Sequence, residues 1–123
     1  MKIILDTHIF LWSVSYPEKI SKHRSSILNS QSNVVYISSI SFSEIFIKEA
    51  INKLRLNFDP IKIAQDSGFE LLDFSADDSK LLKKLPLYHK DPFDRMLISQ
   101  AINRDFKLMT DDKKIKMYDC KLL

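Results

Sequence analysis

The sequence predicts a single α/β domain over residues 1–123, built on a parallel sheet of four or five strands. Short apolar runs alternate with longer amphipathic segments along the whole chain, which is the pattern of strands connected by helices. No repeat or linker interrupts this pattern, and 123 residues are too few for two ordinary domains. A content of 45% hydrophobic and 11% aromatic residues is sufficient for a buried core.

The first quarter of the chain predicts a strand and a helix. Residues 3–5 form a continuous apolar run, as expected for a strand buried on both faces. Residues 17–28 are expected to form a helix whose apolar positions are Ile20, Ile27 and Leu28.

The middle of the chain predicts a second strand and two more helices. Residues 33–38 have the β-branched and aromatic content of a strand, and residues 41–54 form a long amphipathic segment. Asp59 and Pro60 then supply an N-cap and a first helical position for a helix that ends near Gly68.

Residues 70–74 predict the third strand. Ser75 is a candidate N-cap for a helix that ends at Leu85, because Pro86 cannot continue it.

The last elements are a helix and one or two strands. Asp91 and Pro92 repeat the start signal for a helix that extends to Arg104. Residues 107–110 predict a fourth strand, and residues 117–123 could add a short fifth.

Composition excludes several classes of protein. The only glycine, Gly68, rules out glycine-rich phosphate loops, and the only cysteine, Cys120, rules out an intrachain disulfide and a multi-cysteine zinc site. No apolar run approaches the ~18 residues of a membrane span, and the first residues do not resemble a signal peptide. We therefore expect a cytoplasmic protein with no membrane partner.

Ligands of parallel sheets bind at the carboxyl ends of the strands, so acidic residues there are of most interest. Asp6 follows the first strand, where it can be a helix N-cap or a ligand-binding carboxylate. Glu44 lies at the edge of an apolar stripe formed by Ile40, Ile47 and Ile51. The alternative for Glu44 is an ordinary acidic residue in the first turn of a helix.

Asp94 is the acidic residue least expected where it stands. Leu97, Ile98 and Ala101 place it in the middle of the apolar face of its helix. Such a carboxylate must be neutralised, bound to a cation, or paired in a buried salt bridge with a lysine or arginine. Asp91, which precedes a proline, is better explained as an N-cap than as a ligand.

A last pair of acidic residues, Asp111 and Asp112, follows the strand that ends at Thr110. They are either a polar turn or further members of an acidic cluster at the edge where Asp6 is expected. Four elements thus deliver carboxylates to one edge of the sheet, where they would repel one another unless cations bound them. Oxygen ligands suit Mg²⁺ or Mn²⁺, and acidic sites that hold such ions hydrolyse phosphodiester bonds.

Four segments in this order and spacing resemble those of PIN-domain ribonucleases, and most of all the VapC-type toxins of bacterial toxin–antitoxin pairs. They are LDTHIFLW at 5–12, SISFSEIFIKEAINKL at 39–54, HKDPFDRMLISQA at 89–101 and LMTDD at 108–112. The resemblance covers nearly the whole chain. It implies a PIN-like three-layer sandwich, a Mg²⁺- or Mn²⁺-dependent endoribonuclease acting on RNA, a homodimer, and a small cognate antitoxin that blocks the site.

The same resemblance assigns catalytic and metal-binding roles to the acidic residues that match the family's motifs: Asp6, Glu44, Asp94 and Asp112. Accessory candidates near these positions are Asp91, Arg95, Thr110 and Asp111.

Two other functions remain open on the sequence. One is a phosphotransfer domain that uses Asp6 as acceptor, although the second Asp usual in dehalogenase-like phosphatases is absent. The other is a non-catalytic RNA- or protein-binding module on the same fold.

Three further groups of residues have no single interpretation. His23 and His89 show no metal-ligand spacing. Phe42 and Phe46 belong to an aromatic-rich half that forms either core or a partner groove. Eleven Lys/Arg against six Asp/Glu in residues 80–123 could steer RNA or simply be solvated.

Overall fold

A four-stranded parallel sheet forms the centre of the protein. The computed structural model describes residues 1–123 and contains β1 (Lys2–Leu5), β2 (Val34–Ser38), β3 (Glu70–Leu72) and β4 (Lys107–Met109) in the order β3-β2-β1-β4. β1 pairs with β2 on one side and with β4 on the other, and all pairs are parallel. The predicted α/β fold with a parallel sheet is confirmed.

The expected fifth strand is reduced to an isolated bridge. Leu122 pairs in parallel with Leu108, and the amide of Leu123 donates to the carbonyl of Leu108 at 3.0 Å. The C-terminal tail therefore follows the outer edge of β4 without forming a regular strand.

The N-terminal half contains a helix that the sequence reasoning missed. α1 (Thr7–Ser15) begins directly after β1, with Asp6 as its N-cap. The helix expected at 17–28 is divided into a 3₁₀ turn, η1 (Pro17–Lys19), and α2 (Lys22–Asn29). The division occurs because Ser21 is extended and caps α2 by accepting a hydrogen bond from the amide of Arg24.

Of the next two helices, the first begins two residues earlier than expected and the second begins where expected. α3 (Ser39–Ala50) begins immediately after β2, with Ser38 as N-cap, and ends earlier than expected before Asn52, whose φ is 59°. α4 (Pro60–Asp66) is capped by Asp59, as its Asp-Pro sequence predicts.

The C-terminal half contains η2 (Asp77–Lys83), α5 (Pro92–Arg104) and a short turn, η3 (Ile115–Met117). η2 occupies most of the segment expected to be an α-helix, but its geometry is 3₁₀. α5 has the predicted bounds and is capped by Asp91.

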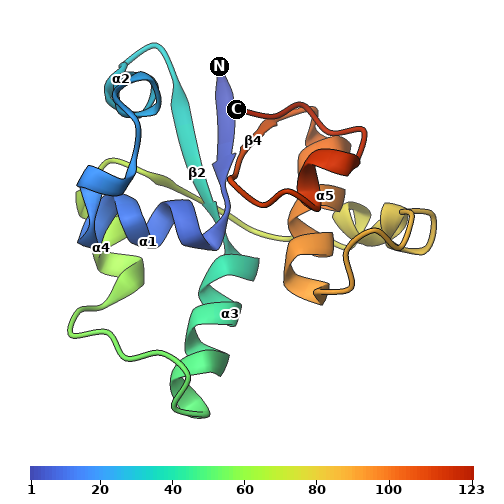
Figure 1. Ribbon diagram of the computed structural model, residues 1–123, viewed down its shortest axis with the longest axis horizontal. Helices are drawn as coiled ribbons and strands as arrows, with labels where there is room; N and C mark the ends of the chain where they lie inside the picture. Colours follow the sequence, from blue (N-terminus) through green and yellow to red (C-terminus); the bar gives the residue numbers. More distant parts are fainter.

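Three layers result, with a separate apolar core on each face of the sheet. Ile3 and Leu5 of β1 face a core that also contains residues of α1, α3 and α4, whereas Ile4 faces a core made largely by α5. Figure 1 shows α1, α2 and α4 on one side of the sheet and α5 on the other. The predicted three-layer arrangement is confirmed, and no helix has the length and apolar character needed to cross a membrane.

A buried carboxylate fixes η2 to α5. The side chain of Asp78 is fully buried and accepts hydrogen bonds from Arg104 Nε at 2.9 Å and from Asn103 Nδ2 at 2.8 Å. Its other oxygen accepts from the amide of Ser75 at 2.9 Å. This network sets the position of the loop that leads into α5.

The sheet order creates a switch point at its centre. After β1 the chain passes to β2 on one side, and it reaches β4 on the other side only through α5. In open α/β sheets, ligands bind outside the carboxyl ends of strands at such a point. Asp6 and Thr110 directly follow the two strands concerned.

Candidate active site

Asp6 is held at the switch point by hydrogen bonds to both of its oxygens. Oδ1 accepts from the amide of Ile9 at 2.8 Å, which makes Asp6 the N-cap of α1, and Oδ2 accepts from the hydroxyl of Thr110. Burial raises the pKa of this carboxyl, although both hydrogen bonds oppose the rise. Asp6 is therefore a structural cap and also a buried carboxylate at the strand end.

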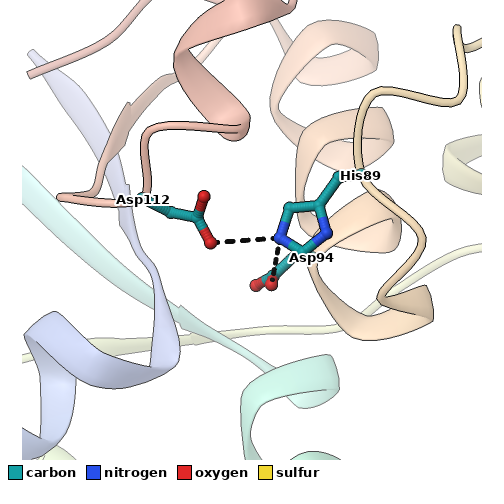
Figure 2. Close-up of side chains that lie close together, drawn as sticks. All are labelled: His89, Asp94 and Asp112. Carbon is teal, nitrogen blue, oxygen red and sulfur yellow. Dashed lines mark hydrogen bonds and ion pairs between the residues drawn. The ribbon is translucent and has the colours of Figure 1, made fainter.

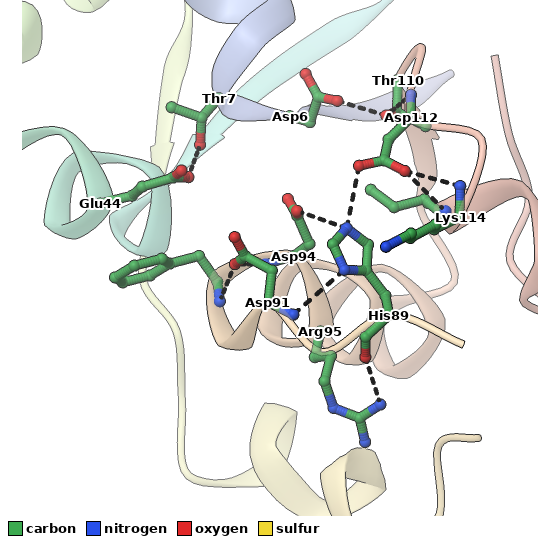
Figure 3. A network of polar contacts seen from close by, with 12 residues as sticks. Asp6, Thr7, Glu44, His89, Asp91, Asp94, Arg95, Thr110, Asp112 and Lys114 are labelled. Atoms are coloured by element: carbon green, nitrogen blue, oxygen red, sulfur yellow. Dashed lines mark hydrogen bonds and ion pairs between the residues drawn. The ribbon is translucent and has the colours of Figure 1, made fainter. Parts of the chain in front are cut away.

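Glu44 enters the same region from α3 (Figure 3). Its side chain is buried, Oε1 accepts from the hydroxyl of Thr7 at 2.7 Å, and Oε2 lies 2.6 Å from Lys48 Nζ. Lys48, one turn further along α3, thus forms an ion pair with Glu44. The predicted stripe is only partly correct, because Ile47 and Ile51 are exposed.

Asp94 and Asp112 approach from α5 and from the segment after β4, and one histidine joins them. His89 Nε2 lies 2.9 Å from Asp94 Oδ2 and 3.0 Å from Asp112 Oδ2 (Figure 2). The salt bridge to lysine or arginine that was the alternative for Asp94 does not form; its partner is His89. These three side chains place potential ligand atoms within 4.8 Å of one another.

The carboxylates influence one another strongly. Burial, followed by the negative charge of Asp91, raises the pKa of Asp94 to about 7; Glu44 and Asp112 add to the rise, and His89 opposes it. The pKa of Asp112 is lowered, since hydrogen bonds from His89 and from the amide of Lys114 outweigh the effect of burial. The concentration of negative charge in this cluster favours the binding of a cation.

Thr110 connects two of the candidate ligands. Its hydroxyl donates to Asp6, and its oxygen accepts from the amide of Asp112 at 3.0 Å. Asp112 is further fixed because Oδ1 accepts from the amide of Lys114 at 2.8 Å. The accessory position predicted for Thr110 is therefore a link between β1 and the segment after β4.

Asp91 acts as the N-cap that its sequence predicts. Its Oδ1 accepts from the amides of Phe93 at 2.9 Å and Asp94 at 3.2 Å. Its charge nevertheless contributes to the negative potential at Asp94.

With four acidic side chains gathered at this edge of the sheet, the family of the chain can be assigned. A model of the PIN domain matches residues 3–120. The chain belongs to the PIN-domain family. No curated protein matches the sequence significantly.

Solved structures share the fold of this PIN domain. A chain of VapBC2 from Rickettsia felis, bound to a promoter DNA fragment, is 21% identical, with a TM-score of 0.76 over 100% of this chain and 98% of that chain. A chain of VapBC-1 from nontypeable Haemophilus influenzae is 19% identical, with a TM-score of 0.67 over 100% and 97%. The PIN domain endonuclease Utp24 is 19% identical, with a TM-score of 0.52 over 94% and 74%.

Two of the accessory candidates lie outside the acidic cluster of this PIN domain. Asp111 is half exposed and pairs with Arg24, which also donates to the carbonyls of Thr110 and Leu123 at 2.8 Å. Arg95 points away from the carboxylates (Figure 3) and donates to carbonyls of the preceding loop.

The residue that sequence reasoning missed is His89. No spacing rule for metal-binding histidines applies to it, because its partners, Asp94 and Asp112, belong to different elements. The available signal was its place in HKDPFDR, just before the helix that carries Asp94.

The basic residues of the C-terminal part have two different roles. Arg95 donates to backbone carbonyls, whereas several lysines are exposed: Lys83, Lys84, Lys90, Lys113, Lys114 and Lys116. The exposed lysines are available to a polyanion.

Proposed function

We propose that this PIN domain is a Mg²⁺- or Mn²⁺-dependent endoribonuclease and the toxin of a toxin–antitoxin pair. The observation that carries the proposal is the gathering of Asp6, Glu44, Asp94 and Asp112 at the carboxyl ends of β1 and β4 (Figure 3). Their donors are carboxylate oxygens, which are the ligands that Mg²⁺ and Mn²⁺ prefer. The raised pKa of Asp94 indicates crowded negative charge that a divalent ion would relieve.

Each acidic residue would hold the ion from a separate element. Asp6 is fixed by Thr110, Glu44 by Thr7, and Asp112 by the amide of Lys114, so these carboxylates are already oriented. A bound divalent ion supplies Lewis-acid activation of water and neutralisation of charge on the phosphate. The exposed lysines would attract the RNA backbone toward this edge.

The structure does not favour the phosphotransfer alternative. A phosphoryl acceptor at Asp6 would not require Glu44 and Asp94, which α3 and α5 bring to the same edge of the sheet (Figure 3). A non-catalytic module would have no need for four carboxylates at one edge, each with a cost of desolvation.

Cleavage of single-stranded RNA tests the proposal. The purified protein should cleave RNA with Mg²⁺ or Mn²⁺, EDTA should abolish cleavage, and Asp94→Asn should remove both cleavage and tight metal binding. Asp66→Asn, at an exposed position on α4, is the matched control and should retain both. If Asp94→Asn retains both, the assignment of the site is wrong.

The partner part of the proposal is tested separately. We expect the product of a short neighbouring gene to bind this chain and to inhibit cleavage, and we expect a homodimer by light scattering. Exposed apolar side chains on and after α3, at Phe46, Ile47 and Ile51, support a protein interface. A monomer with no such inhibitory partner would contradict this part alone.

A further inference from the structure

His89 is held in place through its backbone by α5 and the C-terminal segment. Its amide donates to the hydroxyl of Tyr118 at 2.9 Å, and its carbonyl accepts from Arg95 Nη1 at 3.2 Å. The Tyr118 hydroxyl donates in turn to the carbonyl of Pro86 at 2.6 Å. These contacts fix the backbone that carries the imidazole, and the side chain of His89 is only 11% exposed.

A second contact determines which ring nitrogen carries the proton. The amide of Asp91 donates to His89 Nδ1 at 3.2 Å, so Nδ1 must present a lone pair. The proton therefore resides on Nε2, which faces Asp94 and Asp112 at 2.9 and 3.0 Å. Figure 2 shows Nε2 between the two carboxylates.

We propose that His89 is a positioning residue, which donates its Nε2–H to Asp94 and Asp112 and holds both carboxylates toward a shared divalent ion. This inference rests on the proposed function and adds to it. In many metal sites a carboxylate outside the coordination sphere orients a histidine that binds the metal. Here the roles would be exchanged, with a histidine orienting carboxylates that bind the metal.

The opposite possibility is that His89 Nε2 is itself a metal ligand, since the three side chains could surround one ion. Ligation requires a lone pair on Nε2 and hence a proton on Nδ1. That proton would face the amide hydrogen of Asp91, and the hydrogen bond at Nδ1 would be lost. The backbone of α5 therefore favours coordination by oxygen alone, which suits Mg²⁺ and Mn²⁺ better than softer ions.

The direct test is nitrogen NMR of the histidine ring in the wild-type protein. We expect a proton on Nε2 of His89, both without metal and after addition of Mg²⁺. Observation of the proton on Nδ1, or of coordination through Nε2, would overturn the inference. This measurement needs no variant and no RNA.

Metal titrations with variants give the second test. His89→Ala should weaken Mg²⁺, Mn²⁺ and Co²⁺ binding by a similar factor, about 10- to 100-fold, as typical for loss of an outer-shell partner. His89→Gln, whose amide N–H can reach a similar position, should restore most of the affinity. His23→Gln, at an exposed position on α2, is the control.

The outcomes separate this inference from the proposed function. A loss confined to Co²⁺ would show a nitrogen ligand, and unchanged affinities in a folded His89→Ala protein would show no role; either result overturns the inference. Wild-type protein that binds metal but cleaves no RNA would contradict the proposed function, while the NMR and metal titrations would still decide the role of His89.

Discussion

The hydroxyl of Thr110 donates a hydrogen bond to Oδ2 of Asp6, which links the carboxyl ends of β4 and β1. The hydroxyl oxygen of Thr110 accepts in turn from the amide of Asp112. The side chain of Thr110 thus orients two of the candidate metal ligands, although it is uncharged and is not itself a candidate ligand.

Thr110→Val should therefore impair the site while it retains the shape of the side chain. The buried Asp6 carboxylate would lose a hydrogen-bond donor, and the backbone amide of Asp112 would lose its acceptor. We expect metal affinity and RNA cleavage to fall about 10-fold or more, as for other outer-shell changes. Isothermal titration with Mn²⁺ measures the first and an RNA cleavage assay the second.

Thr110→Ser retains the hydroxyl and serves as the matched control. Its metal affinity should remain close to that of the wild type. Equal losses in the valine and serine variants would mean that the methyl group, not the hydrogen bond, matters at this position.

Asp94→Asn should stabilise the metal-free protein at alkaline pH. The pKa of Asp94 is raised to about 7 by burial and then by the charge of Asp91. Because the folded-state pKa exceeds the ordinary value of 3.8, stability from this group is lost as pH rises from about 4 through about 7. At pH 8 the ionised carboxylate opposes folding, and the neutral amide does not.

The measurement is a thermal melt with EDTA at pH 5 and pH 8. We expect the variant to melt a few degrees above the wild type at pH 8, since about 1 kcal/mol corresponds to roughly 4 °C in a domain of this size, with a smaller difference at pH 5. Addition of Mg²⁺ should raise the melting temperature of the wild type more than that of the variant. A variant that is less stable at both pH values would contradict this account.

The ion pair between the buried Asp78 and the partly exposed Arg104 should contribute to the acid stability of the fold. Burial would raise the pKa of Asp78, but hydrogen bonds from Arg104, Ser75 and Asn103 outweigh it and hold the pKa well below 3.8. The stability it contributes is thus present above about pH 4 and is lost as pH falls below that value. Asp78→Asn should cost about 1–3 kcal/mol near neutral pH, because hydrogen bonds to a buried carboxylate are weakened or lost, while Arg104 is exposed enough to be solvated.

Urea unfolding from pH 7 to pH 3 tests this prediction. The difference in free energy of unfolding between wild type and Asp78→Asn should shrink below about pH 4, where the stability contributed by the wild-type carboxylate begins to be lost. Asp77→Asn is the control: Asp77 is largely exposed and forms its ion pair with the exposed Lys80, so its loss should have little effect. Equal stability of Asp78→Asn and wild type at pH 7 would exclude the proposed role.

Much of this fold follows from local sequence signals. The Asp-Pro pairs at 59–60 and 91–92 correctly mark the starts of α4 and α5, since a cap and a fixed φ act within a few residues. α1 escaped detection because it follows β1 with no connecting loop and because its residues, THIFLWSVS, have no clear apolar face. The exposed Ile47 and Ile51 on the expected buried stripe show the same limit: periodicity identifies an apolar face but not what covers it.

Apart from the family resemblance, the sequence signal for the candidate site was strongest where a residue conflicts with its own local environment. Asp94 stands among residues that are buried, so its sequence alone indicates an unusual role. His89 and Thr110 conflict with nothing near them in sequence, and their importance arises from partners on other elements, such as Asp6 and Asp112. Long-range hydrogen bonds of this kind carry no periodic or spacing signal.

Two adjacent acidic residues, Asp111 and Asp112, should differ sharply in their importance. The structure directs Asp112 toward His89 and fixes it with the amide of Lys114, whereas Asp111 turns outward to Arg24. Asp112→Asn should therefore abolish RNA cleavage and weaken Mn²⁺ binding. Asp111→Asn should leave metal affinity nearly unchanged and reduce stability by at most about 1 kcal/mol, as expected for a half-exposed ion pair.

Metal titration and RNA cleavage with both variants, together with Arg24→Gln, decide between the two residues. Arg24→Gln removes the partner of Asp111 and its contacts to the carbonyls of Thr110 and Leu123, so it should destabilise the C-terminal tail more than Asp111→Asn does. Its metal affinity should stay close to that of the wild type if the carboxylate that matters is Asp112. Loss of metal binding in Asp111→Asn, with Asp112→Asn unaffected, would reverse the assignment. The ligand would then be Asp111, which forms the salt bridge to Arg24 in this structure.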